Sequence, residues 1–232
     1  MKNKIYKSFD EAVADIPDGS TVMCAGFGGV GVPRNLIAAL HRQGAKSLTG
    51  VSNNAGTMDE KIDVGTLVEA GQMKKMICAF TAATHPSQVT PFVRMYNNGE
   101  LDAELVPQGT LAERMRAAGA GIGGFYTPTS VGTELAEGKE HREINGRVHV
   151  LEYPLPGDYA FIRAWKADTF GNLQFRLTQR NFNVVMAMAA KVTIVEVEND
   201  VVEMGELEPD HIHVAGIYVD RIVRIPEDGI WY

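Results

Sequence analysis

The sequence predicts an α/β fold: an open, mostly parallel sheet with flanking helices and an antiparallel elaboration in the second half. Through the first half, short apolar β-prone runs alternate with helical patterns, which is typical of βαβ units. In the second half, Asn145-Gly146 lies between two β-prone runs, a strong signal for a β-hairpin. No repeat, linker or low-complexity segment divides the chain, so we expect residues 1–232 to form a single domain.

The first elements set the pattern. A short helix is expected over residues 8–16, because "SFDE" matches a capping box at its start. Residues 20–25 ("STVMCA") form a β-rich apolar run that leads directly into "GFGGVGVP". Pro33 suits the first turn of the next helix, and Gly44 is the expected stop.

The alternation then continues along the chain. Strands are expected at 46–54, 74–80 and 103–107, and helices at 64–71, 87–96 and 108–121. In the last of these helices, Thr110 and Glu113 match a second capping box. Beyond the hairpin, further strands are expected at 158–165, 191–198 and 216–225, with a helix at 181–190.

Composition excludes several classes of protein. Hydrophobic residues make up 45% and charged residues 22%, which is ordinary for a soluble globular chain. The net charge of −7 argues against nucleic acid or an anionic membrane as the main partner. Cys24 and Cys78 each lie in an apolar run, which fits a reducing cytosol, and neither a signal peptide nor a transmembrane stretch is recognisable. A cytoplasmic protein is expected.

The first glycine cluster predicts a ligand site. Gly26, Gly28 and Gly31 form G-x-G-x-x-G between a strand and a helix, where free N–H groups and the helix dipole favour an anion. A nicotinamide site would need a carboxylate about 20 residues later, but the chain offers Asn53 and Asn54 there. The alternative is that the glycines serve only helix–sheet packing. A second G-x-G-x-x-G, at residues 119–124, follows a helix and is interpreted as a helix cap and loop.

Three strand ends are predicted to meet in one crevice. They are the glycine loop, the pair Asn53-Asn54, and Gln108-Gly109. The expected lining is backbone N–H groups and neutral amides with few charges. It suits a developing oxyanion or a carboxylate, as in acyl transfer, and suits a metal poorly. The alternative for the asparagines is that they make turn hydrogen bonds.

Several segments together carry a family resemblance. "GFGGVGVP", "LTGVSNNAG", "PQGTLAERMRAAGAGIGGFYTPTSVGT", "RNFN" and "GELEPDHIHVAGIYVDRIV" resemble the alpha subunit of family I coenzyme A transferases, from about Ser8 to Val223. The similarity is greatest to the succinyl-CoA:3-oxoacid and 3-oxoadipate branches. By this resemblance, coenzyme A is held by Gly26, Phe27, Gly28, Gly29, Val30, Gly31 and Val32. The substrate pocket is formed by Asn53, Asn54, Gln108 and Gly109.

The resemblance also implies a partner chain. In the family, the attack on the thioester is made by a glutamate of the beta subunit, which carries coenzyme A as a glutamyl thioester. The nearest match to its Glu-Asn-Gly motif here is Glu198-Asn199-Asp200, which lacks the glycine and is interpreted as structural. We therefore expect no catalytic residue in this chain, a beta subunit in a hetero-oligomer, coenzyme A thioesters as substrates, and no permanent cofactor or metal.

The acceptor acid is less constrained. "VSNNAG" favours the 3-oxoacid and 3-oxoadipate branches. Residues 79–93 depart from both and contain no arginine to pair with a distal carboxylate, which favours a monocarboxylic 3-oxoacid such as acetoacetate, with succinyl-CoA as donor. Alternatives are 3-oxoadipate or another short acid as acceptor, and, more remotely, a phosphosugar isomerase or sensor, or a non-catalytic acyl-CoA-binding module.

Four other features suggest chemistry by residue type alone. His211 and His213 have H-x-H spacing but no further ligands nearby, so a zinc site is not expected. Ser130 lacks the first glycine of a G-x-S-x-G elbow, and His85 is assigned to a surface loop. Residues 166–172 ("KADTFGN") are interpreted as a charged turn between strands without assigned chemistry.

Overall fold

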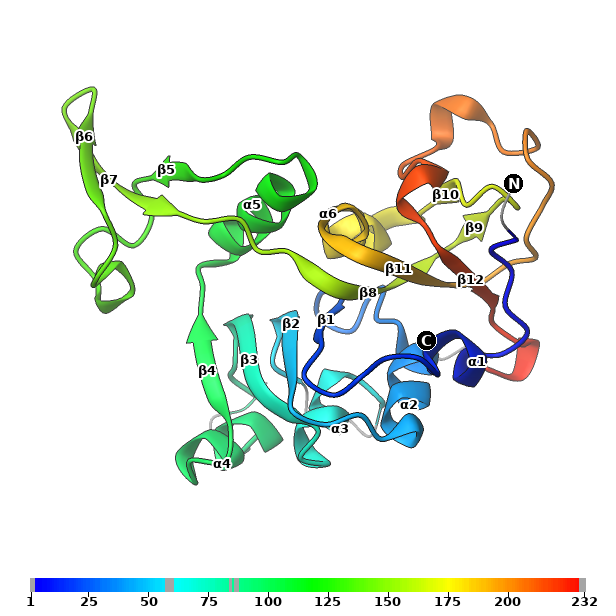
Figure 1. Cartoon of the computed structure of the whole chain (residues 1–232), viewed down its shortest axis with the longest axis horizontal. Helices are drawn as coiled ribbons and strands as arrows, with labels where there is room; N and C mark the ends of the chain where they lie inside the picture. Colours follow the sequence, from blue (N-terminus) through cyan, green and yellow to red (C-terminus); the bar gives the residue numbers. More distant parts are fainter. Residues whose placement is uncertain (1–2, 57–60, 84, 86–87, 230–232) are drawn as a thin grey trace.

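A seven-stranded sheet forms the centre of the computed structural model, which describes residues 3–56, 61–83, 85 and 88–229. Its strand order is β12-β11-β8-β1-β2-β3-β4, and every pairing in it is parallel (Figure 1). Its strands are β1 (Thr21–Cys24), β2 (Leu48–Asn54), β3 (Met73–Phe80), β4 (Asp102–Leu105), β8 (Gly157–Ala164), β11 (Ala190–Val197) and β12 (Arg221–Arg224). The predicted α/β class is confirmed.

Helices cover both faces of this sheet. On one face lie α1 (Phe9–Val13), α2 (Arg34–Gln43), α3 (Val64–Glu69) and α4 (Pro91–Asn97), and on the other α5 (Gln108–Gly119) and α6 (Asn181–Ala189) (Figure 1). Strand alternation explains the two cores: Val22 and Cys24 of β1 point into the first core, whereas Met23 points into the second. None of the described helices is both long and apolar enough to cross a bilayer.

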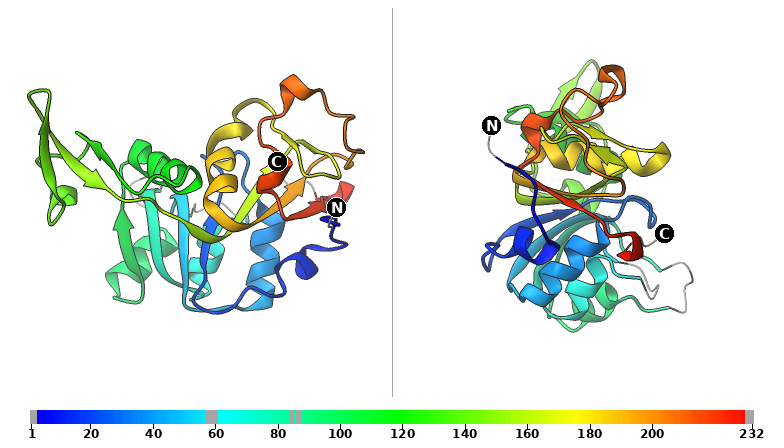
Figure 2. Two further views of the ribbon diagram at one scale, coloured as in Figure 1. Left: turned by 45° about the horizontal axis from the view of Figure 1, so that its top comes forward. Right: turned by 90° about the vertical axis from the view of Figure 1, so that its right-hand side faces the viewer.

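The antiparallel elaboration projects from the body. β5 (Phe125–Thr127), β7 (Arg147–Glu152) and β6 (His141–Ile144) form an antiparallel sheet whose β6–β7 hairpin turns at Asn145-Gly146, as predicted (Figure 2). A smaller hairpin joins β9 (Lys166–Ala167) to β10 (Leu173–Gln174). The later strands β8, β11 and β12 are not part of this elaboration, because they extend the parallel sheet beyond β1.

Two predicted boundaries and one predicted helix cap are wrong. The first helix ends at Val13, although Ser8 caps it as expected by accepting a hydrogen bond from the Glu11 amide. The helix predicted over 108–121 begins at Gln108 as expected, but Thr110 does not cap it, because Thr110 is a buried residue inside its first turn. The strand expected over 216–225 is reduced to β12, because Gly216–Tyr218 forms a 3₁₀ turn. Residue 87, where a further helix is predicted to begin, lies outside the described residues. In the structure this helix, α4, begins at Pro91.

The order in which strands are added to the sheet changes direction at one place. From β1 the chain proceeds outward through β2, β3 and β4, and the later strands β8, β11 and β12 are added on the other side of β1. The switch of direction therefore lies between β1 and β8. Ligands of open α/β sheets bind outside the carboxyl ends of strands at such a switch point.

Candidate functional site

The glycine loop follows β1 at this switch point. It turns back on itself, since the amides of Phe27 and Val30 each donate to the other's carbonyl oxygen at 3.0 Å. Gly26 has φ +116°, and a Cβ there would lie 2.5 Å from Cγ2 of Val32. A Cβ on Gly31 would lie 2.7 Å from Nδ2 of Asn183. Only glycine fits at these two positions.

The tip of the loop is open to a ligand. Within the described part of the chain, the amides of Gly28 and Gly29 have no protein acceptor. The side chains of Phe27 and Val30 beside them are 48% and 45% exposed. The loop therefore offers hydrogen-bond donors flanked by apolar side chains.

The start of α2 is not the free anion site that the sequence predicts. The amides of Asn35 and Leu36 donate to Oε2 of Glu196, at 2.9 and 3.1 Å. The Arg34 amide donates to the Val32 carbonyl oxygen, and the Ile37 amide donates to that of Pro33. Pro33 at the N-cap has no N–H, so the three N–H groups that this helix start leaves without helical partners, those of Arg34, Asn35 and Leu36, are all satisfied by the protein.

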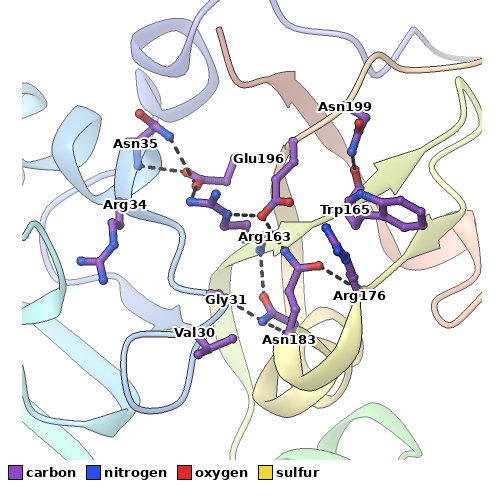
Figure 3. Close-up of polar contacts among 12 residues, drawn as sticks. Val30, Gly31, Arg34, Asn35, Arg163, Trp165, Arg176, Asn183, Glu196 and Asn199 are labelled. Carbon is purple, nitrogen blue, oxygen red and sulfur yellow. Dashed lines mark hydrogen bonds and ion pairs between the residues drawn. The ribbon is translucent and has the colours of Figure 1, made fainter. Parts of the chain in front are cut away.

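A buried polar network lies behind the loop (Figure 3). Glu196 is 0% exposed, and burial raises its pKa to about 7, because the loss of hydration outweighs the stabilising effect of Arg163 and the α2 amides. Arg163 donates through Nε to Glu198 at 2.8 Å and lies 3.5 Å from Glu196. Its backbone amide donates to Oδ1 of Asn183, whose Nδ2 donates to the Gly31 carbonyl oxygen at 3.1 Å. The expectation of few charges around the loop is therefore wrong.

The predicted amides at the ends of β2 and β4 do come together. Nε2 of Gln108 donates to Oδ1 of Asn53 at 2.7 Å, and Nδ2 of Asn53 donates to Oδ1 of Asn54 at 2.7 Å. Asn53 is only 2% exposed, whereas Gln108 and Gly109 are exposed. The three amides form a single chain of donors that ends on Nδ2 of Asn54. This group has no acceptor among the described residues and can donate to a ligand oxygen.

Two cavities flank the glycine loop. A narrow one of about 20 Å³ lies between residues 26–29 of the loop and Asn54. Burial raises the pKa of Cys24, which also lines it, to about 12, so this thiol is protonated and is not a nucleophile. A larger cavity of about 310 Å³ lies on the β8 side, between residues 29–32 and Glu198.

The sequence reasoning did not find the residues behind the loop. Asn183 belongs to the "RNFN" motif that carried part of the resemblance, and this motif was the only available signal. Arg163 and Glu196 lie inside strands that are covered on both faces, and a charged residue in such a run carries no local signature. Glu198 accepts hydrogen bonds from Arg163 and Gln179, which agrees with the structural role expected for it.

The other residues that suggest chemistry by type lie in turns and loops or bind the protein's own backbone. Nδ1 of His213 accepts a hydrogen bond from the Phe175 amide, and the described residues contain no group of three ligands for a metal. Ser130 is half-buried in a turn, with φ +71°. Asp168 accepts from the amides of Phe170, Gly171 and Asn172, so the 166–172 segment is a tight turn as predicted. His85 lies in a bend between β3 and α4.

Comparison with known proteins places these features in one family. The family model described as "Coenzyme A transferase" matches residues 6–224. One subunit of the probable succinyl-CoA:3-ketoacid coenzyme A transferase of Bacillus subtilis is 53% identical over 95% of this chain and 89% of its own length. One subunit of the 3-oxoadipate CoA-transferase of Pseudomonas putida is 50% identical over 97% of this chain and 95% of its own.

Solved structures agree on the fold. Glutaconate coenzyme A-transferase from Acidaminococcus fermentans superposes with a TM-score of 0.81 at 23% identity, covering 96% of this chain and 76% of that one. A single-residue variant of the decarboxylase AibA/AibB gives 0.80 at 26% identity, covering 99% and 86%. The fold is thus shared by enzymes of more than one reaction class. The match of the family model over nearly the whole chain and the close relatives show that the chain belongs to the coenzyme A transferase family.

Proposed function

We propose that this chain is the alpha subunit of a two-chain CoA-transferase that moves coenzyme A from succinyl-CoA to a 3-oxoacid such as acetoacetate. The observation that carries the proposal is the convergence of the open glycine loop with the chain of amides from Gln108 to Asn54. Two relatives at 53% and 50% identity, each named as one subunit of a CoA-transferase, support both the activity and the partner.

The loop and the amides have separate tasks in this reaction. Gly26, Phe27, Gly28, Gly29, Val30, Gly31 and Val32 contact coenzyme A, with the amides of Gly28 and Gly29 as donors. Asn53, Asn54, Gln108 and Gly109 line the acyl pocket. There, Nδ2 of Asn54 donates to the thioester oxygen as it gains negative charge, or to the carboxylate of the acid substrate.

The nucleophile comes from the partner. The thioester carbonyl carbon is attacked by a glutamate carboxylate of the beta subunit, the C–S bond breaks, and a mixed anhydride forms. The released thiolate then attacks the glutamyl carbonyl, which frees the first acid and leaves a glutamyl-CoA thioester for the second acid. Glu198 is unsuited to this step because Arg163 and Gln179 hold the same carboxylate oxygen.

Thioester exchange between succinyl-CoA and acetoacetate tests the proposal. The chain is assayed alone and after co-purification with the product of the adjacent reading frame. We expect activity only in the mixture, because the attacking glutamate is on the partner. Activity of the chain alone would contradict the two-chain assignment, and a purified pair that is inactive with every short acid would contradict the transferase.

The choice of acceptor is tested in the same assay. Acetoacetate is expected to have a higher kcat/KM than 3-oxoadipate. The 50% identity to the 3-oxoadipate enzyme of Pseudomonas putida makes 3-oxoadipate the alternative acceptor. A preference for 3-oxoadipate would overturn the acetoacetate assignment and leave the transferase class intact.

A further inference from the structure

Glu196 does more than fill the core behind the glycine loop. We propose that it is a positioning residue, which holds the loop in the shape that binds the acyl-CoA by capping α2 with its carboxylate. The kinetic part of this inference rests on the proposed function, whereas the structural part does not. The route of action is indirect, since Glu196 is 0% exposed and cannot touch a ligand itself.

One end of the loop is fixed by the carboxylate itself. The loop runs into α2 without a side-chain cap, since Pro33 occupies the N-cap position. Oε2 of Glu196 accepts hydrogen bonds from the amides of Asn35 and Leu36. Its Oε1 accepts a hydrogen bond from Nδ2 of Asn35 at 3.4 Å. A carboxylate from β11 therefore takes the place of the missing cap and also complements the helix dipole.

The residues between the loop tip and α2 are held by side chains of α6. Arg163 lies 3.5 Å from Glu196, and its backbone amide orients Asn183 by donating to Oδ1. Asn183 then donates to the carbonyl oxygen of Gly31 (Figure 3). Asn181 donates to the carbonyl oxygen of Val30 at 3.1 Å. The segment that follows Gly28 and Gly29 is thus held at Val30, Gly31, Asn35 and Leu36.

Stability alone is a poor explanation of this cluster. Burying a carboxylate and a guanidinium costs several kcal/mol of hydration, and apolar side chains of similar volume often stabilise a fold as well or better. What apolar side chains cannot supply is two acceptors aimed at the first turn of α2. The consequence for the ligand is specific: its anionic groups meet the amides of Gly28 and Gly29, not the helix terminus.

The test replaces the carboxylate by its neutral isostere. In Glu196→Gln one acceptor becomes a donor, which faces either the α2 amides or the Arg163 guanidinium and breaks one set of contacts. Glu206→Gln is the matched control, because Glu206 is exposed on the surface. Both are compared with wild type in the complex with the partner chain at pH 8, above the raised pKa of Glu196.

Two readouts separate positioning from a merely structural role. We expect Glu196→Gln to raise KM for succinyl-CoA at least about tenfold with KM for acetoacetate unchanged, a loss of about 1.4 kcal/mol in binding. We also expect faster hydrogen exchange at the amides of Asn35 and Leu36. A lower melting temperature with unchanged KM and unchanged exchange would overturn the proposal.

A second variant is used in case Glu196→Gln does not fold. Asn183→Ala releases Gly31 and leaves the Glu196 carboxylate in place, and we expect it to raise the same KM. An unchanged KM in this variant would overturn the inference. If the wild-type complex shows no transfer at all, the proposed function fails, and hydrogen exchange at the amides of Asn35 and Leu36 then tests the role of Glu196. Faster exchange in Glu196→Gln than in Glu206→Gln supports positioning. Equal exchange in the two variants contradicts it.

Discussion

Asn53 is the residue that orders the predicted acyl pocket. It is almost completely buried, yet its amide is polar, so its position depends on hydrogen bonds at both ends. Gln108 fixes the direction of that amide by donating to Oδ1, which leaves Nδ2 of Asn53 to donate to Asn54. Because Gln108 sets the direction of this chain of hydrogen bonds, Nδ2 of Asn54 can donate to a ligand.

Replacing Gln108 tests this order. Gln108→Ala is expected to lower kcat/KM for transfer by about 10²-fold, because Asn53 and Asn54 lose their fixed direction and the donor on Asn54 is no longer aligned. Gln108→Glu should be worse, because a carboxylate accepts from Asn53, reverses the chain and adds negative charge. Steady-state kinetics of the two-chain enzyme measure both, with Asn97→Ala at the exposed end of α4 as control. Equal activity of wild type and both variants would exclude Gln108 from the pocket.

At the scale of elements, the packing of α5 on α6 positions Gln108 relative to the loop. Gly119, at the end of α5, allows this close approach, since a Cβ there would lie 2.7 Å from the carbonyl oxygen of Met188 in α6. The glycine was interpreted from the sequence as part of a helix cap and loop. The structure adds that its lack of a side chain is needed by a neighbouring helix.

A pair of alanine variants in the same helix tests the close approach. Gly119→Ala is expected to destabilise the chain by about 1–3 kcal/mol, because the backbone of α6 must move. Gly109→Ala, where a Cβ meets nothing within 4 Å, should be neutral or stabilise by up to about 1 kcal/mol through helix propensity. Urea unfolding gives both values. Two variants of equal stability would show that the helices separate without cost.

At the scale of the whole molecule, the N-terminal segment closes the far edge of the sheet. Ile5 forms a parallel bridge with Ile222, so the N-terminal segment lies along the edge strand β12. Nζ of Lys4 donates to the carbonyl oxygens of Phe170 and Gly216 at 2.8 and 2.7 Å. This one side chain joins three segments that are distant in sequence.

Removing the ammonium group tests that closure. Lys4→Met keeps most of the aliphatic stem and is expected to lower the free energy of unfolding by about 1–2 kcal/mol, since two carbonyl oxygens lose a charged donor. Lys46→Met, at an exposed lysine, is the control and should change little. Thermal unfolding measured by calorimetry distinguishes them. A Lys4 variant as stable as the control would mean that the closure rests on the Ile5–Ile222 bridge alone.

Local patterns along the chain were enough to predict the α/β class, most elements, the glycine loop and the Gln108–Asn53–Asn54 cluster. The signals were periodicity, glycine turns and polar residues directly after strands, and each is contained in a short stretch of residues. The single-domain organisation, the cytoplasmic location and the absence of a permanent cofactor stay predictions.

How the loop is held depends on contacts that form only in the folded chain. The sequence indicated a free anion site at the start of α2, but Glu196 comes from a strand about 160 residues away and occupies it. It also indicated a capping box at Thr110, although the helix begins at Gln108 and Thr110 is a buried residue inside its first turn. The amides at a helix start and the members of a buried ion pair find their partners only when the chain folds. These partners can be far away in the sequence, so no short stretch of residues predicts them.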